Sequence, residues 1–272
     1  MAVHLVDAAG TEHVPLNTHA VPRIVSLVPS ITELLCDLGL ARWIVGRTGF
    51  CIHPAEVVAA IPKIGGTKDV NLEKIRKLAP THLIVNIDEN EKPTVDLLAQ
   101  FIPHVIVTHP QTPRDNLPLY RLLGGIFAAE GQALRLCEEF ECAFAALAAG
   151  PRRDPGTVLY CIWKDPWMTV ARNTYIGAML GLIGLQQWDS GLPQAERGGL
   201  RYPQFEWNAD LLAGIDEILL SSEPYRFTEA HVAELGRETG KPVRLVDGEM
   251  FSWYGSRAIQ GLRYLQEYNS RR

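Results

Sequence analysis

The sequence predicts an α/β protein with two Rossmann-like lobes, each containing a parallel sheet between helices. Short, apolar, β-rich segments alternate with segments of helical periodicity through most of the 272 residues. One long amphipathic segment separates these strands into two groups. Such alternation is typical of parallel sheets covered by helices, and the length allows one large or two modest domains.

The expected strands are buried, because they are short apolar runs without a polar face. In the first half they cover residues 23–28, 82–87 and 104–108. In the second half they cover residues 157–162, 216–221 and 243–246. The order of strands and helices indicates one sheet for each half.

The segment 131–150 is expected to be a long helix. Its apolar residues recur at steps of four and three, and it contains no internal Gly or Pro. About 18 residues at 1.5 Å each would form a rigid rod of roughly 27 Å. We therefore expect an N-terminal α/β lobe, a linking helix and a C-terminal α/β lobe at 1–128, 129–150 and 151–272. The alternative is a surface helix of one large sheet.

Composition excludes several classes of function. The net charge is −5 and the longest basic block is Arg152-Arg153, so no nucleic-acid partner is expected. No apolar run approaches the roughly 18 residues that span a bilayer. The first residues lack the pattern of a signal peptide, and five cysteines without a CxxC pair argue against a disulfide framework. A cytoplasmic location would follow if the sequence as written were complete.

The stretch LVPSITELLCDLG, residues 27–39, predicts a strand that turns directly into a helix. We expect Ser30 and Glu33 to form a reciprocal capping box and Gly39 to end the helix. Such a turn leaves helix amide groups at the carboxyl edge of the sheet, where α/β folds bind ligands. Pro29 and Ser30 are therefore candidate ligand residues, and an ordinary capped helix is the alternative.

The stretch TGFCIHP brings Phe50, Cys51 and His53 together within four residues. Two potential donors are too few for a protein-held metal site. We expect these three residues to line a ligand pocket, while metal ligation and plain loop packing remain alternatives.

Rings and carboxylates follow strand after strand in the second half. Because the carboxyl ends of parallel strands meet at one edge, these side chains are expected to form a pocket wall. The candidates are Trp163, Asp165, Trp167, Glu223, Tyr225, Glu249, Phe251, Trp253, Tyr254 and Arg257. For the last segment, DGEMFSWYGSR at 247–257, the alternative is an aromatic lock that fastens the final helix to the sheet.

Catalytic signatures are missing from the sequence. It contains no G-x-S-x-G elbow, no Walker lysine loop and no G-x-G-x-x-G after a strand. No Asp, Glu or His pair has a spacing that demands acid–base chemistry. We therefore expect no catalytic residues and no enzyme activity.

Two stretches carry a resemblance to a known family. RIVSLVPSITELLCDLGL and IGGTKDVNLEKIRKLAPTHLIV resemble the signatures of periplasmic substrate-binding proteins with a rigid helical backbone. These proteins bind cobalamin, haem or ferric siderophores for ABC transporters, and this sequence is most similar to the vitamin B12-binding branch. The resemblance extends from about residue 22 onward and implies a ligand cleft between the lobes.

The resemblance also implies roles for particular residues. It places ligand contacts at Pro29, Ser30, Phe50, Tyr202 and the segment around Glu249 to Trp253. Thr67 and Ile87 stand where vitamin B12-binding members tend to carry tryptophan. The family's first docking acid, which meets the transporter, corresponds to Glu73. Its counterpart in the second lobe would be Glu206 or Asp210, and Asn208 is a third candidate for that position.

The most favoured function is a monomeric receptor that delivers cobalamin or a related corrinoid to the membrane subunits of an ABC importer. The protein would hold no cofactor or metal of its own, because the metal would arrive inside the ligand. The resemblance implies a periplasmic location. The alternatives are a siderophore or haem receptor, a cytoplasmic enzyme or chaperone for tetrapyrroles or metal complexes, and a carbohydrate or small-acid binder.

Overall fold

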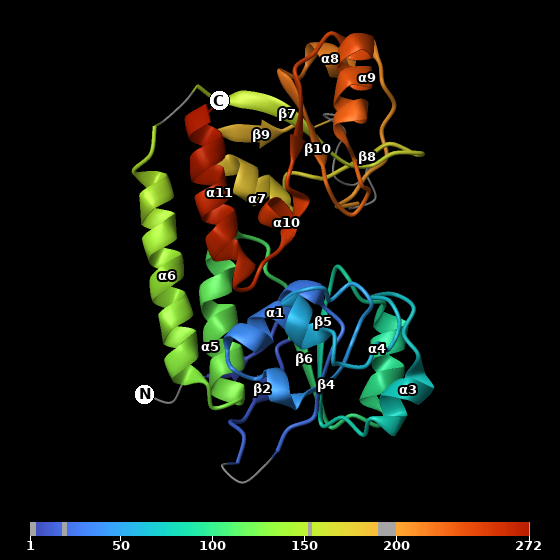
Figure 1. Ribbon diagram of the computed structural model, residues 1–272, viewed down its shortest axis with the longest axis vertical. Coiled ribbons are helices and arrows are strands. Elements are labelled where there is room, and N and C mark those ends of the chain that lie inside the picture. The colour runs from blue at the N-terminus through green and yellow to red at the C-terminus, as the bar shows by residue number, and fades with distance from the viewer. Residues whose placement is uncertain (1–3, 18–20, 152–153, 190–199, 272) are drawn as a thin grey trace. The chain divides into compact units, whose positions relative to one another are not determined.

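The structure is a computed structural model that describes residues 4–17, 21–151, 154–189 and 200–271. The chain forms two compact units, and each has an α/β architecture (Figure 1). Unit 1 comprises Met1–Pro110, Arg114–Glu141 and Tyr254–Arg257. Unit 2 comprises Gln111–Pro113, Cys142–Trp253 and Ala258–Arg272. The predicted fold class, with mainly parallel sheets in two lobes, is confirmed.

The main sheet of unit 1 is parallel throughout its described residues. Its strands lie in the order β4 (Ile44–Arg47), β3 (Ile24–Ser26), β5 (His82–Asn86) and β6 (His104–Thr108). Helices α3 (Leu72–Lys77) and α4 (Lys92–Ala99) lie on one side of this sheet, and α1 (Pro29–Asp37) and α5 (Asn116–Ile126) lie on the other (Figure 1). The unit is completed by η1 (Ala41–Trp43), α2 (Ala55–Val58), η2 (Pro113–Asp115) and the antiparallel hairpin of β1 (Leu5–Val6) and β2 (Glu12–His13).

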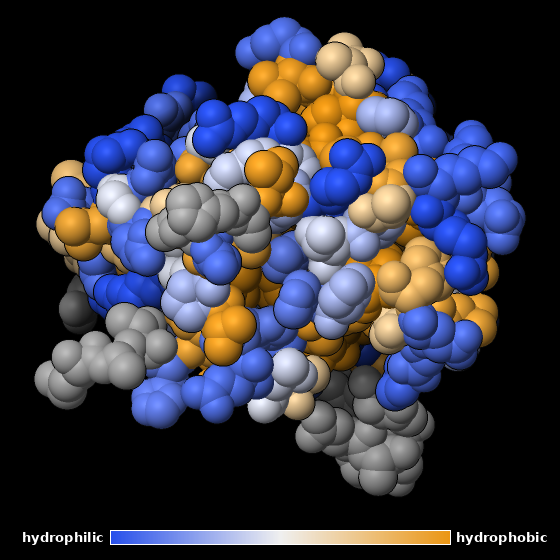
Figure 2. All heavy atoms as spheres, turned by 90° about the horizontal axis from the view of Figure 1, so that it is seen from below, coloured by the Kyte–Doolittle hydropathy of each residue, from blue (hydrophilic) through white to orange (hydrophobic). Residues whose placement is uncertain are grey.

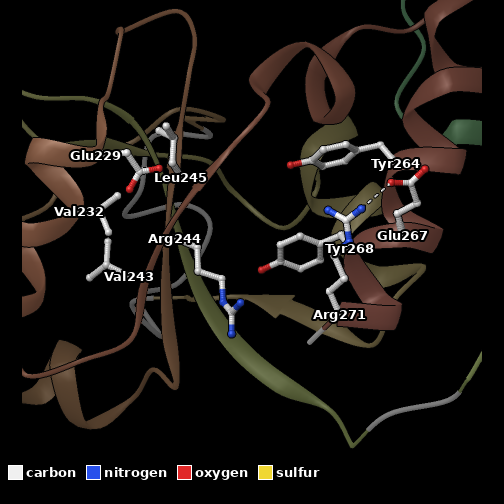
Figure 3. A pocket seen from close by; sticks show the side chains of 9 residues that line it. All are labelled: Glu229, Val232, Val243, Arg244, Leu245, Tyr264, Glu267, Tyr268 and Arg271. Carbon is white, nitrogen blue, oxygen red and sulfur yellow. Dashed lines mark hydrogen bonds and ion pairs between the residues drawn. The ribbon is translucent and has the colours of Figure 1, made fainter.

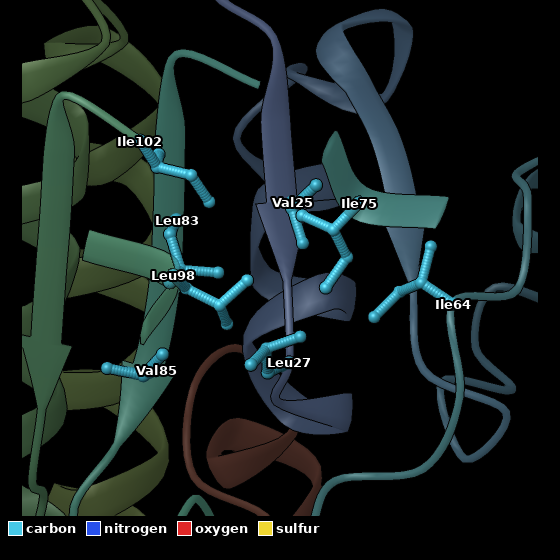
Figure 4. Packing of buried hydrophobic residues seen from close by; sticks show 8 residues of the cluster. All are labelled: Val25, Leu27, Ile64, Ile75, Leu83, Val85, Leu98 and Ile102. Carbon is cyan, nitrogen blue, oxygen red and sulfur yellow. The ribbon is translucent and has the colours of Figure 1, made fainter. Parts of the chain in front are cut away.

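The core of unit 1 lies between its sheet and the helices α3 and α4. Side chains from β3 and β5 meet side chains from both helices in this layer (Figure 4). The cluster consists of Val25, Leu27, Ile64, Ile75, Leu83, Val85, Leu98 and Ile102. Their burial explains why the sequence shows β3 and β5 as nearly continuous apolar runs.

Unit 2 has a mixed sheet. Strands β11 (Val243–Val246), β10 (Glu217–Ser221) and β7 (Gly156–Trp163) are parallel, β9 (Leu185–Gln187) is parallel to β7, and β8 (Met168–Thr169) is antiparallel to it. Its helices are α7 (Tyr175–Gly181), α8 (Ala209–Ala213), α9 (Glu229–Thr239), α10 (Gly248–Ser252) and α11 (Arg257–Arg271). The short strands β8 and β9 were not predicted, because they are too short to show a periodic pattern.

The helix predicted over 131–150 is α6 (Glu130–Ala148). Its apolar stripe is buried, as expected for an amphipathic helix. The buried members include Ala133, Cys137, Phe140, Ala143 and Leu147. Residues of α6 belong to both units, while the predicted domain limits 1–128, 129–150 and 151–272 stay a prediction.

The start of α1 corrects the predicted capping box. The helix begins at Pro29, directly after an extended Val28, and no side chain caps it. Proline suits this position because the first helical amide needs no partner and the ring fixes a helical φ. Glu33 forms an ion pair elsewhere in unit 1. At the other end, Gly39 has a φ of +79° and closes the helix, as predicted.

The segment Tyr254–Arg257 packs against α1 and α5 of unit 1. The amide of Gly255 donates to Asn116 Oδ1 over 2.6 Å, and Tyr120 Oη donates to the Gly255 carbonyl over 2.8 Å. Gly255 has a φ of +77°, and a Cβ here would lie 3.0 Å from the Ser30 carbonyl oxygen. Both the backbone conformation and the close approach therefore require glycine.

Arg257 and Glu33 form a buried, two-point ion pair inside unit 1. Arg257 Nε donates to Glu33 Oε2 over 2.7 Å, and Nη2 donates to Oε1 over 2.6 Å. Both residues are 8% exposed. The neighbouring Tyr254 hydroxyl donates to the carboxylate of Glu89. A planar guanidinium matches a carboxylate in this two-point arrangement, so the pair fixes the segment on α1.

A buried histidine lies at the amino end of β5. His82 is 5% exposed, stacks on His104 with ring centroids 4.7 Å apart, and meets the edge of Phe127 at 5.1 Å. Burial, with smaller effects of His104 and His13, lowers the pKa of His82 to about 4. The folded state therefore keeps this imidazole neutral at pH values where the unfolded chain protonates it.

The stability of the protein should fall as the pH drops from about 6.5 to about 4, because only the unfolded state binds a proton at His82 in this window. The loss is expected to be roughly 3 kcal/mol of unfolding free energy. Urea denaturation followed by circular dichroism across this range would measure it. His82→Gln should flatten the slope, whereas the exposed His4→Gln should keep it. Equal slopes in all three proteins would contradict this role of His82.

Glu33→Ala should lower the unfolding free energy by about 3–5 kcal/mol, because it leaves the buried Arg257 guanidinium without its carboxylate. Urea denaturation at pH 7 is the measurement. Glu267→Ala is the matched control: it removes an exposed ion pair with Arg271 and should cost less than about 1 kcal/mol. A Glu33→Ala protein as stable as the control would show that the pair does not hold the segment.

Candidate functional site

Large apolar side chains are exposed where the strands of unit 1 end. Phe50 (63% exposed) and Ile52 (48%) follow β4, and Ile87 (50%) follows β5. These strands run parallel, so their carboxyl ends share one edge of the sheet. Ligands of open α/β sheets bind at the carboxyl ends of the strands, so this edge of the sheet is the candidate binding surface of unit 1.

The ring of Phe50 lies against the loop that contains Gly65 and Gly66, called the glycine loop below. The amide of Gly49 donates to the carbonyl of Gly65 over 2.7 Å, and a Cβ on Gly66 would lie 3.5 Å from Phe50 Cε2. Gly65 has a φ of +120°, and a Cβ there would come within 2.3 Å of the Asp69 carbonyl oxygen. Only glycine fits at this position, so the loop that supports the ring has a fixed shape.

Thr67 lies at the same edge. Its carbonyl accepts a hydrogen bond from Asn90 Nδ2 over 2.9 Å, and Asn90 Oδ1 accepts from the amide of Asn86 over 2.8 Å. These bonds tie the glycine loop to the turn after β5. The half-buried Thr67 is thus placed near the exposed apolar group, and its contact with a ligand stays a prediction.

Cys51 is an interior residue. It is 0% exposed, and its Sγ lies 3.1 Å from Thr32 Oγ1 and 3.2 Å from Thr48 Oγ1. Burial raises the pKa of the Cys51 thiol. The structure therefore separates Cys51, which presents no surface to a ligand, from Phe50, which does. His53 is half-buried.

The turn into α1 is largely covered. Pro29 is half-buried, and Ser30 is 3% exposed. Within the described residues, Ser30 Oγ is buried without a hydrogen-bond partner. A contact of either residue with a ligand stays a prediction.

In unit 2, Trp163 and Tyr202 expose part of their rings. Trp163 ends β7 and is 39% exposed, and its ring meets Tyr225 edge-on with centroids 5.6 Å apart. Tyr202 is 38% exposed. Its neighbours in the chain bond to the strand region of β8, since the amide of Ala171 donates to the carbonyl of Arg201 over 2.7 Å. Their contact with a ligand stays a prediction.

Trp167 is half-buried and belongs to a cluster of rings in unit 2. It stacks on Phe227 at 5.8 Å and meets Trp207 edge-on at 5.3 Å and Phe205 at 6.1 Å. These rings pack against the core cluster of unit 2 that includes Leu211 of α8 and Leu235 of α9. Within the stretch 161–175, Trp163 and Asp165 are therefore exposed, whereas Trp167 is half-buried against neighbouring rings.

The predicted segment 247–257 divides in the same way. Phe251 is 0% exposed and meets Tyr160, Tyr264 and Tyr268 with centroids 5.4, 5.9 and 6.4 Å away. This matches the aromatic-lock alternative, because the ring fastens α10 to β7 and α11. The following ring, Trp253, is 8% exposed, and its Nε1 donates to Glu223 Oε1 over 2.8 Å.

The polar residues of the segment 247–257 belong to different parts of the fold. Asp247 caps α10 by accepting from the amide of Glu249 over 3.1 Å, and Glu249 is half-buried. Tyr254 and Arg257 belong to unit 1, where Arg257 pairs with Glu33. This guanidinium has a buried carboxylate partner and so has a structural role, and its contact with a ligand stays a prediction.

A cavity of about 390 Å³ opens in unit 2 beside the edge strand β11 (Figure 3). Residues of β11 line one wall and residues of α11 the other, with α9 contributing the rest. The lining residues are Glu229, Val232, Val243, Arg244, Leu245, Tyr264, Glu267, Tyr268 and Arg271. None of them is a predicted site residue, so this cavity is distinct from the surfaces described above.

Within the described ranges, no three His, Cys, Asp or Glu side chains gather as ligands for a metal ion. Over the same residues, no helix is both long and apolar enough to span a membrane. The face seen in Figure 2 carries groups of hydrophobic residues among hydrophilic ones. The expectation that the protein holds no metal of its own stays a prediction.

The acids considered for docking are all exposed. Glu73 lies in the first turn of α3, which Asn71 caps by accepting from the amide of Lys74 over 2.9 Å. Asp210 lies in the first turn of α8, and Glu206 precedes that helix. Carboxylates in the first turn of a helix interact favourably with its dipole, so their position alone does not reveal a partner.

Several residues around these surfaces were not found from the sequence. Glu89, Asn116 and Tyr120 bind the Tyr254–Arg257 segment, and Ile52 adds to the exposed apolar group. The sequence could have revealed Ile52, because it lies between the candidate residues Cys51 and His53. The other three are distant in sequence from their partners, so no local pattern reveals them.

Comparison with known proteins identifies the family. The periplasmic binding protein family matches residues 24–210, which is more than half of the chain. No curated protein matches the sequence.

Solved structures share the fold at low identity. The periplasmic vitamin B12 binding protein BtuF of Vibrio cholerae is 19% identical, with a TM-score of 0.73 over 92% of this chain and 96% of that chain. The periplasmic heme-binding protein RhuT from Roseiflexus sp. is 22% identical, with a TM-score of 0.73 over 92% and 98%. A possible iron-binding periplasmic protein from Staphylococcus epidermidis is 18% identical, with a TM-score of 0.72 over 91% and 98%. The chain therefore belongs to the periplasmic binding protein family, whose members bind solutes and are not enzymes.

Proposed function

We propose that this protein is the substrate-binding component of an ABC importer and that its ligand is a metal-containing macrocycle, with cobalamin as the first candidate. The observation that carries the proposal is the exposed apolar group of Phe50, Ile52 and Ile87 at the carboxyl edge of the unit 1 sheet. Flat macrocycles offer broad apolar faces, and burying them against such side chains is favourable.

The identity of the side chains bears on the shape of the ligand. The edge combines one ring, Phe50, with the aliphatic Ile52 and Ile87. A single ring with branched aliphatic neighbours suits the uneven edge of a corrinoid as well as the flat face of a porphyrin. The names of similar structures include a vitamin B12 binding protein and a heme-binding protein, which supports both classes.

Haem is the second candidate, and Tyr202 favours it. Its phenol is 38% exposed in unit 2, and a tyrosine oxygen is a known axial ligand of haem iron. Cobalamin brings its own lower ligand and would not need this phenol. The two candidates can therefore be separated by substituting Tyr202.

The proposed metal travels inside the ligand, and the protein supplies surface and hydrogen bonds. Trp163, Tyr225 and Trp253 would add rings from unit 2, and Glu249 would add a polar contact. The proposed partners are the membrane subunits of the importer, met through Glu73 in unit 1 and Glu206 or Asp210 in unit 2. We propose that the protein acts as a monomer in the periplasm, with no nucleic-acid partner.

Phe50→Ala should weaken ligand binding by about 1–2 kcal/mol, because it removes an exposed ring that the ligand would cover. Absorbance titration with cyanocobalamin and with haemin would measure the affinities. Leu134→Ala removes a similarly exposed side chain, 60% exposed on α6, and should change nothing. Binding of neither compound by the unaltered protein would refute the proposed ligand class, and equal effects of both variants would refute the proposed surface.

Glu73→Ala should leave ligand affinity unchanged and lower uptake roughly tenfold, because losing one charged hydrogen bond at a docking surface costs about 1.4 kcal/mol. Uptake of radiolabelled ligand by cells that carry the importer is the measurement. Glu56→Ala, another exposed acid in the first turn of a unit 1 helix, is the matched control. Loss of ligand affinity in Glu73→Ala would place this residue in the ligand site instead.

A further inference from the structure

Glu223 lies just beyond the carboxyl end of β10 and receives two side-chain hydrogen bonds on one oxygen. Ser252 Oγ donates to its Oε1 over 2.7 Å, and Trp253 Nε1 donates to the same atom over 2.8 Å. Ser252 is the last residue of α10, and Trp253 follows it. A single carboxylate oxygen thus fixes the last turn of this helix and the plane of the indole that follows it.

The backbone that carries Glu223 is itself held tightly. Ser221 Oγ donates to the Glu223 carbonyl over 2.5 Å, and the amide of Gly248 donates to Ser222 Oγ over 2.9 Å. A Cβ on Gly248 would lie 2.6 Å from Glu223 Cγ and 2.4 Å from Ser221 Oγ. Gly248 therefore allows the start of α10 to pack directly on the Glu223 turn, and the carboxylate has little freedom to move.

The surroundings of Glu223 disfavour its negative charge. Asp247 and Glu249 face it from α10, and the phenol of Tyr160 approaches from β7, where its hydroxyl donates to Ser221 Oγ over 3.1 Å. Burial raises the pKa of Glu223, Glu249 and Asp247 raise it further, and the bonds from Ser252 and Trp253 oppose this shift. In the part of the chain that the structure describes, no cation pairs with this carboxylate.

We propose that Glu223 is a positioning residue: its ionised carboxylate fixes the indole of Trp253 in the wall that contacts the ligand, and protonation of Glu223 loosens that indole. The inference rests on the proposed function, because it assigns Trp253 to the ligand wall. A charged acceptor makes hydrogen bonds about twice as strong as a neutral one. The neutral carboxyl can still accept at Oε1, so the indole becomes less firmly held rather than released.

The consequence is a proton-dependent affinity. At pH values above the pKa of Glu223, the carboxylate is ionised and holds the indole in one orientation, so the ligand meets a preorganised surface. Below it, the ligand must order the indole on binding, so the affinity should fall. We expect roughly a fivefold to tenfold loss, the equivalent of the difference between charged and neutral hydrogen bonds at this site.

The indole itself provides the direct test. In ¹H–¹⁵N spectra of the full-length protein, the Trp253 Nε1–H signal should shift with pH, with a midpoint above that of an exposed glutamate, about 4.3. Glu223→Gln keeps an acceptor but cannot ionise, so the signal should no longer titrate. Glu238→Gln, an exposed acid on α9, should leave the titration unchanged. A signal that titrates equally in Glu223→Gln, or not at all in the unaltered protein, would overturn the proposal.

The Trp253 signal is identified by its loss in Trp253→Phe, which keeps an aromatic ring and removes the donor. If that variant does not fold, the signal is the indole resonance that Glu223→Gln displaces at pH 7 and Glu238→Gln does not. This assignment needs no ligand. The spectra therefore test the hydrogen bond between Trp253 and Glu223 even if the proposed ligand class is wrong.

Affinity measurements complete the test. The affinity of the unaltered protein for cyanocobalamin, or for haemin if only haemin binds, should fall between pH 7 and pH 4.5, and Glu223→Gln should show the weaker affinity at both values. Affinity that is independent of pH and of Glu223→Gln, while the indole signal titrates, would refute the link to the ligand. Binding of neither compound would refute the proposed function, and the spectra alone would then decide the role of Glu223.

Discussion

The buried ion pair of Glu33 and Arg257 connects residues that lie 224 positions apart in the sequence. It fixes a four-residue segment from near the chain end on the first helix of unit 1, where Asn116, Tyr120 and Glu89 add further bonds. A guanidinium taken out of water needs its carboxylate, so neither partner is satisfied until both are in place. Unit 1 is therefore complete only after almost the whole chain has been made.

Parallel strands impose the second constraint. Their carboxyl ends share an edge, so loops that are distant in sequence gather there without any direct attraction between them. In unit 1 this places Phe50, Ile52 and Ile87 along one edge, and the glycine at position 65 allows the supporting loop its tight shape. The apolar surface is thus a product of sheet topology and backbone geometry, and the side chains give it its chemistry.

Unit 2 uses its aromatic residues for two different purposes. Phe251 packs inside, whereas Trp163 and Tyr202 keep part of their rings in contact with solvent. Trp253 lies between these cases, because its indole is mostly covered and hydrogen-bonded to Glu223. The half-buried carboxylate of Glu223 holds this indole in one orientation, so the charge of Glu223 is connected to the proposed binding.

The sequence by itself determined the α/β class, the positions of β3, β5, β6, β7, β10 and β11, and the long helix α6, because apolar periodicity and helix-ending glycines are local properties of the chain. It did not reveal β4. It also indicated the loops that follow the strands. Only the tertiary structure decided which rings in those loops face solvent and that Arg257 belongs to Glu33. Burial and ion pairing depend on residues far away in the chain, and no local pattern records which distant partner a side chain will meet.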